Sequence, residues 1–179
     1  KRTREIPLME KLLLFVKHNL KSVWRIIEWI NGFSFYIIYY SKLNTELKNA
    51  INNDIGNSRL IFRKIEYSDL HLLYEMISNQ NKDDLKYFNP HSFDMASLEW
   101  HFKNPAFLMM GAFDGDRMVG YFFLRFFINR KCFVGRLIDK DYRGKGIGQT
   151  MNKIMYETAW RMGFRCLSTI SKKNELVMK

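Results

Sequence analysis

Hydrophobic residues near the N-terminus recur at intervals of three and four, with charged side chains between them. The apolar positions are Met9, Leu12, Val16, Leu20, Val23, Ile27 and Ile30. This period predicts an amphipathic helix of about five to six turns. Asn31-Gly32 predicts the C-terminal end of that helix. The aromatic run Phe33–Tyr40 fits either a helix or a strand, and a second helix is expected to continue to Asn49.

The polar segment Asn52–Ser58 separates this region from the rest of the chain. Its Asn, Asp, Gly and Ser residues are typical of a turn or linker. We therefore place a domain boundary here. The prediction is an amphipathic helical extension over residues 1–55 and a second domain over residues 56–179.

Beyond the linker, short apolar runs alternate with segments of helical period. Strands are expected at Leu60–Ile65, Ala106–Phe113, Met118–Ile128, Cys132–Ile138 and Phe164–Ile170. Helices are expected from Ser68 or Asp69 to Ser78, over Phe93–Phe102 with Ser92 as the cap, and over Ile147–Met162. Asp114-Gly115-Asp116 predicts a tight hairpin turn. The order predicts a mixed α+β fold in which an antiparallel meander is joined to one parallel crossover.

The excess of positive charge indicates an anionic partner. The chain has 179 residues, of which 47% are hydrophobic, and a formal net charge of +11. This composition excludes intrinsic disorder, and the charge suits nucleic acid, a membrane surface or a phosphorylated small molecule. Residues 116–165 hold eleven Lys or Arg against four Asp or Glu. Because most of the surplus brackets one loop, and no helix-turn-helix or RNP-like pattern is present, we favour a small polyanionic ligand and expect no nucleic-acid partner.

Cysteine usage and hydropathy indicate a cytoplasmic protein. Cys132 and Cys166 lie far apart with no CxxC spacing, so we expect buried free thiols, no disulfide framework and no metal site. The early apolar run Leu12–Val16 is too short for a signal peptide. The uncharged stretch Trp29–Ser41 is shorter than the ~18–20 residues that a spanning helix needs.

The segment from Leu137 to Gln149 has the arrangement of a phosphate-binding loop. A predicted strand leads into a loop with three alternate glycines, and a predicted helix follows at once. The first N–H groups of a helix are unpaired and carry partial positive charge, and glycines let a phosphate approach them closely. Arg143 and Lys145 add mobile positive charge. Neither the Walker A pattern nor the dinucleotide fingerprint is matched.

The loop Arg143-Gly144-Lys145-Gly146-Ile147-Gly148 resembles the acyl-CoA loop of the GCN5-related N-acetyltransferase (GNAT) superfamily. It matches the family pattern Q/R-x-x-G-x-G/A at every fixed position, and the resemblance extends over Arg59–Asn174. The resemblance implies a twisted, mostly antiparallel sheet flanked by helices. It also implies acetyl-CoA as the acyl donor and an N-acetyltransferase activity toward a small-molecule amine.

The same resemblance implies roles for individual residues. The backbone amides that would bind the CoA pyrophosphate are those of Arg143, Gly144, Lys145, Gly146, Ile147, Gly148 and Gln149. Backbone groups of Leu137 and Ile138 would pair with the pantetheine arm, and Asn174 falls where many members place a cofactor-side Asn. The tyrosine that many members use as general acid would lie beyond Lys179, so we expect the C-terminal part of the fold to be missing.

The acceptor side is less sharply defined. His91 lies in a loop that commonly shapes the acceptor pocket in this family, and it is our catalytic candidate; the alternative is a capping or packing role. The base could be a carboxylate or a histidine acting through water. Neither cysteine has a convincing base partner, which favours direct transfer in a ternary complex over an acyl-enzyme.

Two short sequences bear on the substrate. Phe88-Asn89-Pro90-His91 and Gly120–Arg125 look similar to family members that modify surface polysaccharides or amino sugars. This implies an amino-sugar acceptor, which Arg125 would meet if it is anionic. The alternative is a non-catalytic acyl-CoA-binding or membrane-surface protein of the same fold.

The sequence allows two roles for the N-terminal helix. With Trp24 and Trp29 it could lie in the plane of a membrane. It could instead pack on the domain or on a second subunit of a homodimer. We favour packing, because the polar face also carries Glu10 and Glu28.

Overall fold

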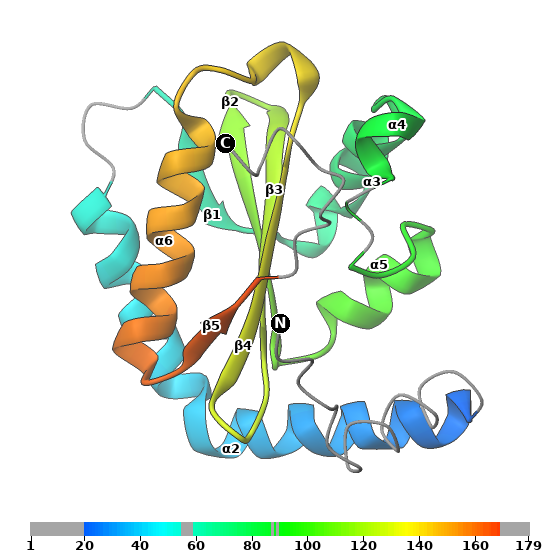
Figure 1. Cartoon of the computed structure of the whole chain (residues 1–179), viewed down its shortest axis with the longest axis vertical. Helices are drawn as coiled ribbons and strands as arrows, with labels where there is room; N and C mark the ends of the chain where they lie inside the picture. The colour runs from blue at the N-terminus through cyan, green and yellow to red at the C-terminus, as the bar shows by residue number, and fades with distance from the viewer. Residues whose placement is uncertain (1–19, 55–58, 87, 89, 169–179) are drawn as a thin grey trace, which may run out of the picture.

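The computed structural model describes residues 20–54, 59–86, 88 and 90–168 (Figure 1). Its helices are α2 (Lys21–Asp54), α3 (Leu70–Ser78), α4 (Lys82–Leu85), α5 (Met95–Phe102) and α6 (Ile147–Met162). Its strands are β1 (Ile61–Lys64), β2 (Phe107–Asp114), β3 (Arg117–Phe126), β4 (Lys131–Ile138) and β5 (Arg165–Leu167). Short 3-10 helices, η1 (Tyr67–Asp69) and η2 (Lys140–Tyr142), precede α3 and the glycine loop. The predicted mixed α+β order is confirmed.

The five strands form one sheet in the order β1-β2-β3-β4-β5. Each neighbouring pair is antiparallel except β4 and β5, which are parallel and joined through α6. The parallel pairing runs only from Lys131 opposite Arg165 to Phe133 opposite Leu167. β4 continues to Ile138. Within the described residues, the last part of β4 is therefore paired with β3 alone.

Helices cover both faces of the sheet (Figure 1). α2 and α6 pack on one face and share a core cluster that includes Phe35, Phe122 and Met151. α3 and α5 pack on the other face, over a cluster that includes Leu73 and Tyr121. Because successive side chains of a strand point to opposite faces, the long apolar strands β2 and β3 supply both clusters.

α2 is one continuous helix, so the predicted stop at Asn31-Gly32 is wrong. Both residues face the domain and are held there. The side chain of Asn31 donates to the carbonyl oxygen of Phe126 at 2.8 Å and accepts from the amide of Ile128 at 3.1 Å. A Cβ atom on Gly32 would lie 2.6 Å from Oδ1 of Asn104. Glycine serves close packing here rather than helix termination, and the run Phe33–Tyr40 is helical.

The second half of α2 enters the main core. Phe35, Leu43 and Leu47 are almost fully buried, and the ring of Phe35 stacks on that of Phe126 with 4.9 Å between centroids. The predicted helix over residues 9–19, the linker residues 55–58 and the end of the last predicted strand lie outside the described residues.

Two local predictions differ from the structure. The cap of α5 is Asp94 rather than Ser92, and its carboxylate accepts from the amide of Ser97 at 2.9 Å. The short helix α4 lies in a stretch predicted to be a loop. None of the helices in the described part of the chain has the length and hydrophobicity that crossing a bilayer requires.

Candidate functional site

The glycine loop between β4 and α6 has an open backbone. Gly144 and Gly146 adopt φ values of 75° and 79°, in the left-handed region where other residues are strained. A Cβ atom at either position would meet no atom within 4 Å. The loop therefore presents bare main chain to a ligand, and the two glycines keep it in this shape.

The N-terminus of α6 points its amides into this opening. Gly146 is the N-terminal cap residue, and its carbonyl oxygen accepts from the amides of Gln149 and Thr150 at 3.0 and 3.3 Å. Among the described residues, the amides of Ile147 and Gly148 find no main-chain acceptor. Unpaired N–H groups and the helix dipole favour an anion at this place.

Two cationic side chains border the loop. Arg143 donates to Oε1 of Gln80 at 3.1 Å and to the carbonyl oxygen of Ile138 at 3.3 Å. Lys145 places its ammonium group 4.5 Å from the centroid of the Tyr142 ring. The Arg143 contact ties the loop to the end of α3, so the loop and that helix form one wall of the site.

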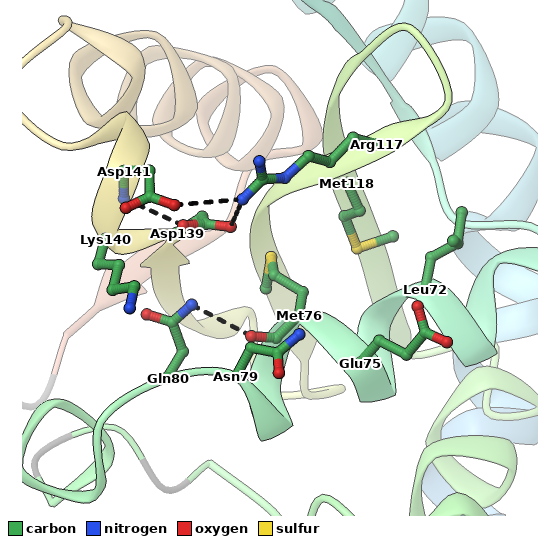
Figure 2. A pocket seen from close by; sticks show the side chains of 10 residues that line it. All are labelled: Leu72, Glu75, Met76, Asn79, Gln80, Arg117, Met118, Asp139, Lys140 and Asp141. Carbon is green, nitrogen blue, oxygen red and sulfur yellow. Dashed lines mark hydrogen bonds and ion pairs between the residues drawn. The ribbon is translucent and has the colours of Figure 1, made fainter.

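The turn that leads into the loop is held by an ion pair (Figure 2). Asp139 is buried and accepts from Arg117 at 2.8 Å and from the amide of Asp141 at 3.0 Å. Arg117 also lies 3.5 Å from Asp141. Asp139 thus shapes the turn. Beside it lies a cavity of about 400 Å³ between α3, the start of β3 and η2, with Met76, Gln80 and Lys140 among its lining residues.

The end of β4 carries the predicted site residues Leu137 and Ile138, and also Arg136, which was not predicted from the sequence. Leu137 is buried toward α3 and α5, whereas Ile138 packs on the cluster under α6. Arg136 donates a hydrogen bond to Asn152 of α6. A Cβ atom on Gly148 would lie 3.0 Å from Nε of Arg136. A guanidinium group therefore lies beside the first turn of α6. Strand alternation could have identified it, because residues 136 and 138 share a face.

His91 is buried and uses both ring nitrogens. Nδ1 lies 2.8 Å from the carbonyl oxygen of Ser92, and Nε2 lies 3.0 Å from the hydroxyl of Tyr121. Burial, with a smaller effect from His101 and Arg125, lowers the pKa of His91 to about 4. The neutral ring must then donate from Nδ1 and accept from Tyr121 at Nε2. His91 does not cap α5, because Asp94 does.

A second cavity of about 400 Å³ lies between the first half of α2 and α5. Its lining includes His91, Trp24 and Trp100, and the guanidinium of Arg25 lies 4.4 Å from the ring centroid of Trp100. Arg125 is ion-paired with Glu28 at the same cavity. From the sequence we expected Arg125 to meet an anionic acceptor, but its described partner is the carboxylate of Glu28.

The sheet register connects the two regions. Tyr121 lies opposite Leu137, so the partner of His91 is a strand neighbour of a predicted donor-binding residue. Cys132 and Cys166, distant in sequence, lie opposite each other on β4 and β5, and both thiols are free. Asn174 lies outside the described residues. Within the described residues, no three His, Cys, Asp or Glu side chains gather as a metal site would require.

Comparison with known proteins agrees with this geometry. Residues 73–176 match the model of the acetyltransferase (GNAT) family. The fold is similar to the GNAT domain of PAT from S. lividans, with a TM-score of 0.56 and 13% identity over 65% of this chain and 75% of that one. No curated protein sequence matches the chain at a significant level.

Two further solved structures are similar to this chain. One is yncA, a putative acetyltransferase from Salmonella typhimurium solved with its cofactor acetyl-CoA, with a TM-score of 0.53 and 16% identity over 68% of this chain and 75% of that one. The other is AAC(6')-Iy in complex with the bisubstrate analog CoA-S-monomethyl-acetylneamine. Its TM-score is 0.53 and its identity 14%, over 68% of this chain and 86% of that one.

Proposed function

The chain belongs to the GNAT family of acetyltransferases, and on this basis we propose that it transfers an acetyl group from acetyl-CoA to the amine of a small molecule. The observation that carries the proposal is the open backbone at Gly144 and Gly146, directly before the N-terminus of α6. A diphosphate fits such a place because unpaired amides and the helix dipole both favour negative charge.

The loop and strand residues receive distinct roles in this proposal. The amides from Gly144 to Gly148 hold the pyrophosphate, because those of Arg143 and Gln149 already donate to Lys140 and Gly146. The side chains of Arg143 and Lys145 add charge. The last residues of β4, Leu137 and Ile138, offer main-chain groups to the pantetheine arm, on the edge where β4 has no parallel partner among the described residues. Bound acetyl-CoA supplies the thioester, and the protein supplies orientation and exclusion of water.

Direct transfer to a neutral amine is the step that these side chains support. Cys132 is fully buried, and burial raises the pKa of its thiol, so it is a poor nucleophile. His91 stays our candidate on the acceptor side. Because its Nε2 accepts from Tyr121, its proposed role is to position that hydroxyl and the surrounding aromatic side chains rather than to carry a proton.

For the acceptor we propose an amino sugar bound between α2 and α5. The cavity there offers the indole rings of Trp24 and Trp100 to a sugar ring, and an amine would share the carboxylate of Glu28 with Arg125. The fold likeness to AAC(6')-Iy, solved with an acetylneamine bisubstrate analog, is in line with such a substrate.

A matched pair of glycine variants tests the donor site. Gly146 and Gly163 begin and end α6, both have φ of 79°, and a Cβ at either meets no atom within 4 Å. Gly146→Val and Gly163→Val therefore impose the same backbone strain. Only Gly146→Val places a side chain in the proposed pyrophosphate site, the glycine loop before α6. We expect calorimetry to show that Gly146→Val loses CoA binding while Gly163→Val keeps it. Equal CoA affinity in the two variants would contradict the proposal that the glycine loop binds the CoA pyrophosphate.

The activity is tested by mass spectrometry of candidate acceptors incubated with acetyl-CoA and the protein. We expect amino sugars to gain an acetyl group while free CoA is released. Tight CoA binding without acetylation of any amine would instead support the non-catalytic acyl-CoA-binding alternative.

A further inference from the structure

α2 exposes a continuous apolar face. Val23, Ile26, Ile30, Phe33 and Ile37 recur at intervals of three and four and are between 43% and 66% exposed. The α2 apolar face consists of these residues together with Trp29, Tyr36, Ile38 and Tyr40. It extends along roughly 26 Å of helix. An exposed apolar surface of this extent in a folded domain marks a site of interaction.

The opposite side of α2 is anchored, so this face cannot turn inward. Phe35, Leu43 and Leu47 are buried in the core. Asn31 is hydrogen-bonded to the turn between β3 and β4, and Glu28 is ion-paired with Arg125. These contacts fix the rotation of the helix about its axis.

The charges around the face have one sign. The described carboxylates of α2 whose side chains are placed are Glu28 and Glu46, and they pair with Arg125 and Arg161 on the domain side. The α2 apolar face itself consists only of apolar and aromatic residues. Among the described side chains, the exposed cations of α2 are Arg25, Lys42 and Lys48, and Arg130 and Lys131 are exposed at the adjoining turn and the start of β4.

The turn between β3 and β4 extends the same surface. The amide of Ile128 donates to the side chain of Asn31, which places the turn beside α2. Ile128 is 55% exposed, and Arg130 in the turn and Lys131 at the start of β4 are exposed as well. An apolar surface bordered by cations is therefore formed by α2 and this turn together.

We propose that the α2 apolar face binds an anionic lipid bilayer, with α2 lying in the plane of the membrane. Exposed cations beside an apolar helical face match negatively charged headgroups. Trp29, Tyr36 and Tyr40 combine an aromatic body with a polar tip, which suits the boundary between headgroups and acyl chains. The helix lacks the hydrophobicity to cross the bilayer.

The same charges disfavour a second copy of the chain as the occupant. A two-fold contact through this face would bring two identical sets of cations together without a carboxylate on the face to offset them. The donor loop would remain accessible on the membrane. Figure 1 places the loop between β4 and α6 at the opposite end of the sheet from the first half of α2.

Sedimentation with lipid vesicles tests the proposal. The probe is a vesicle of phosphatidylglycerol and phosphatidylcholine in equal parts, with phosphatidylcholine vesicles for comparison. Ile37→Glu places a charge on the face, and Ile61→Glu is the matched control because Ile61 is similarly exposed, at 56%, on β1. We expect the full chain and Ile61→Glu to bind the anionic vesicles, and Ile37→Glu to bind about tenfold more weakly or not at all.

Three results would overturn the proposal. The first is equal vesicle binding by Ile37→Glu and Ile61→Glu, which would mean charge attraction without the face. The second is no vesicle binding together with a dimer in light scattering that Ile37→Glu converts to a monomer. The third is binding that appears only after residues 1–19 are removed, which would assign the face to that segment. CoA affinity, measured in parallel, reports on the donor site independently.

Discussion

The hydroxyl of Tyr121 and Nε2 of His91 lie 3.0 Å apart, and both side chains are buried. Tyr121 sits in the middle of β3, and His91 precedes α5. Their hydrogen bond therefore joins the sheet to the segment before α5, on the face where we place the acceptor. Because His91 is neutral, the bond needs no counter-charge.

Removing this bond should weaken the fold. Tyr121→Phe leaves Nε2 of His91 buried without a donor, and we expect the free energy of unfolding to fall by about 1–3 kcal/mol. Urea denaturation measures the change. Tyr67→Phe is the control, because its hydroxyl bonds Glu99 at the surface, and we expect it to have little effect. Similar losses in both variants would contradict a special role for the buried bond.

Stability should decrease as the solution becomes mildly acidic. Burial lowers the pKa of His91 from 6.5 to about 4, so the folded state takes up a proton less readily than the unfolded chain. The resulting stabilisation is complete above pH 6.5 and is lost as the pH falls through about 4. This shift corresponds to a loss of up to ~3 kcal/mol. The pKa of His101 is also lowered by burial and adds to the same trend.

A glutamine variant isolates the contribution of His91. His91→Gln retains an acceptor for Tyr121 but does not titrate, so its free energy of unfolding should depend less on pH across this window. Asp69 and Asp94 have pKa values lowered from 3.8 by their hydrogen bonds, so their titration falls below the window. An unchanged pH dependence in His91→Gln would show that the ring is not the group responsible.

Arg136 should strengthen binding of the donor. Its guanidinium group lies beside the first turn of α6, next to Gly148, where the proposed pyrophosphate site begins. We expect Arg136→Met to weaken CoA binding about tenfold, the loss of one charge-assisted hydrogen bond. Arg165→Met is the control, because Arg165 is exposed on β5. Calorimetry that gives the two variants the same CoA affinity would exclude this role.

Local patterns were enough to predict much of the fold. The strands of the meander, the hairpin turn and the helix from Ile147 to Met162 follow from side-chain period and turn chemistry within a few residues. Gly163, which follows the predicted last residue Met162, is the C-terminal cap of that helix and has a left-handed backbone. The glycine loop could be predicted from the sequence as well, because a positive φ and the start of a helix depend only on neighbouring residues.

Long-range packing decided what the sequence pattern could not. Gly32 seemed to end a helix, but it allows α2 to approach Asn104 and continue. Strand register set Cys132 opposite Cys166 and Tyr121 opposite Leu137. The sequence does not show which residues of two strands will lie opposite each other, because the register depends on how the whole sheet assembles.

By itself, the sequence determined the alternation of strands and helices and the phosphate-binding loop, because periodicity and glycine backbone freedom act over a few neighbouring residues. Only the tertiary structure decided that His91 is buried against Tyr121, that Arg136 stands beside the loop, and that one side of α2 is anchored while the other is exposed. Burial and contact across the sheet depend on all elements at once, and those are the terms that set the pKa of His91 and the surface left for a partner.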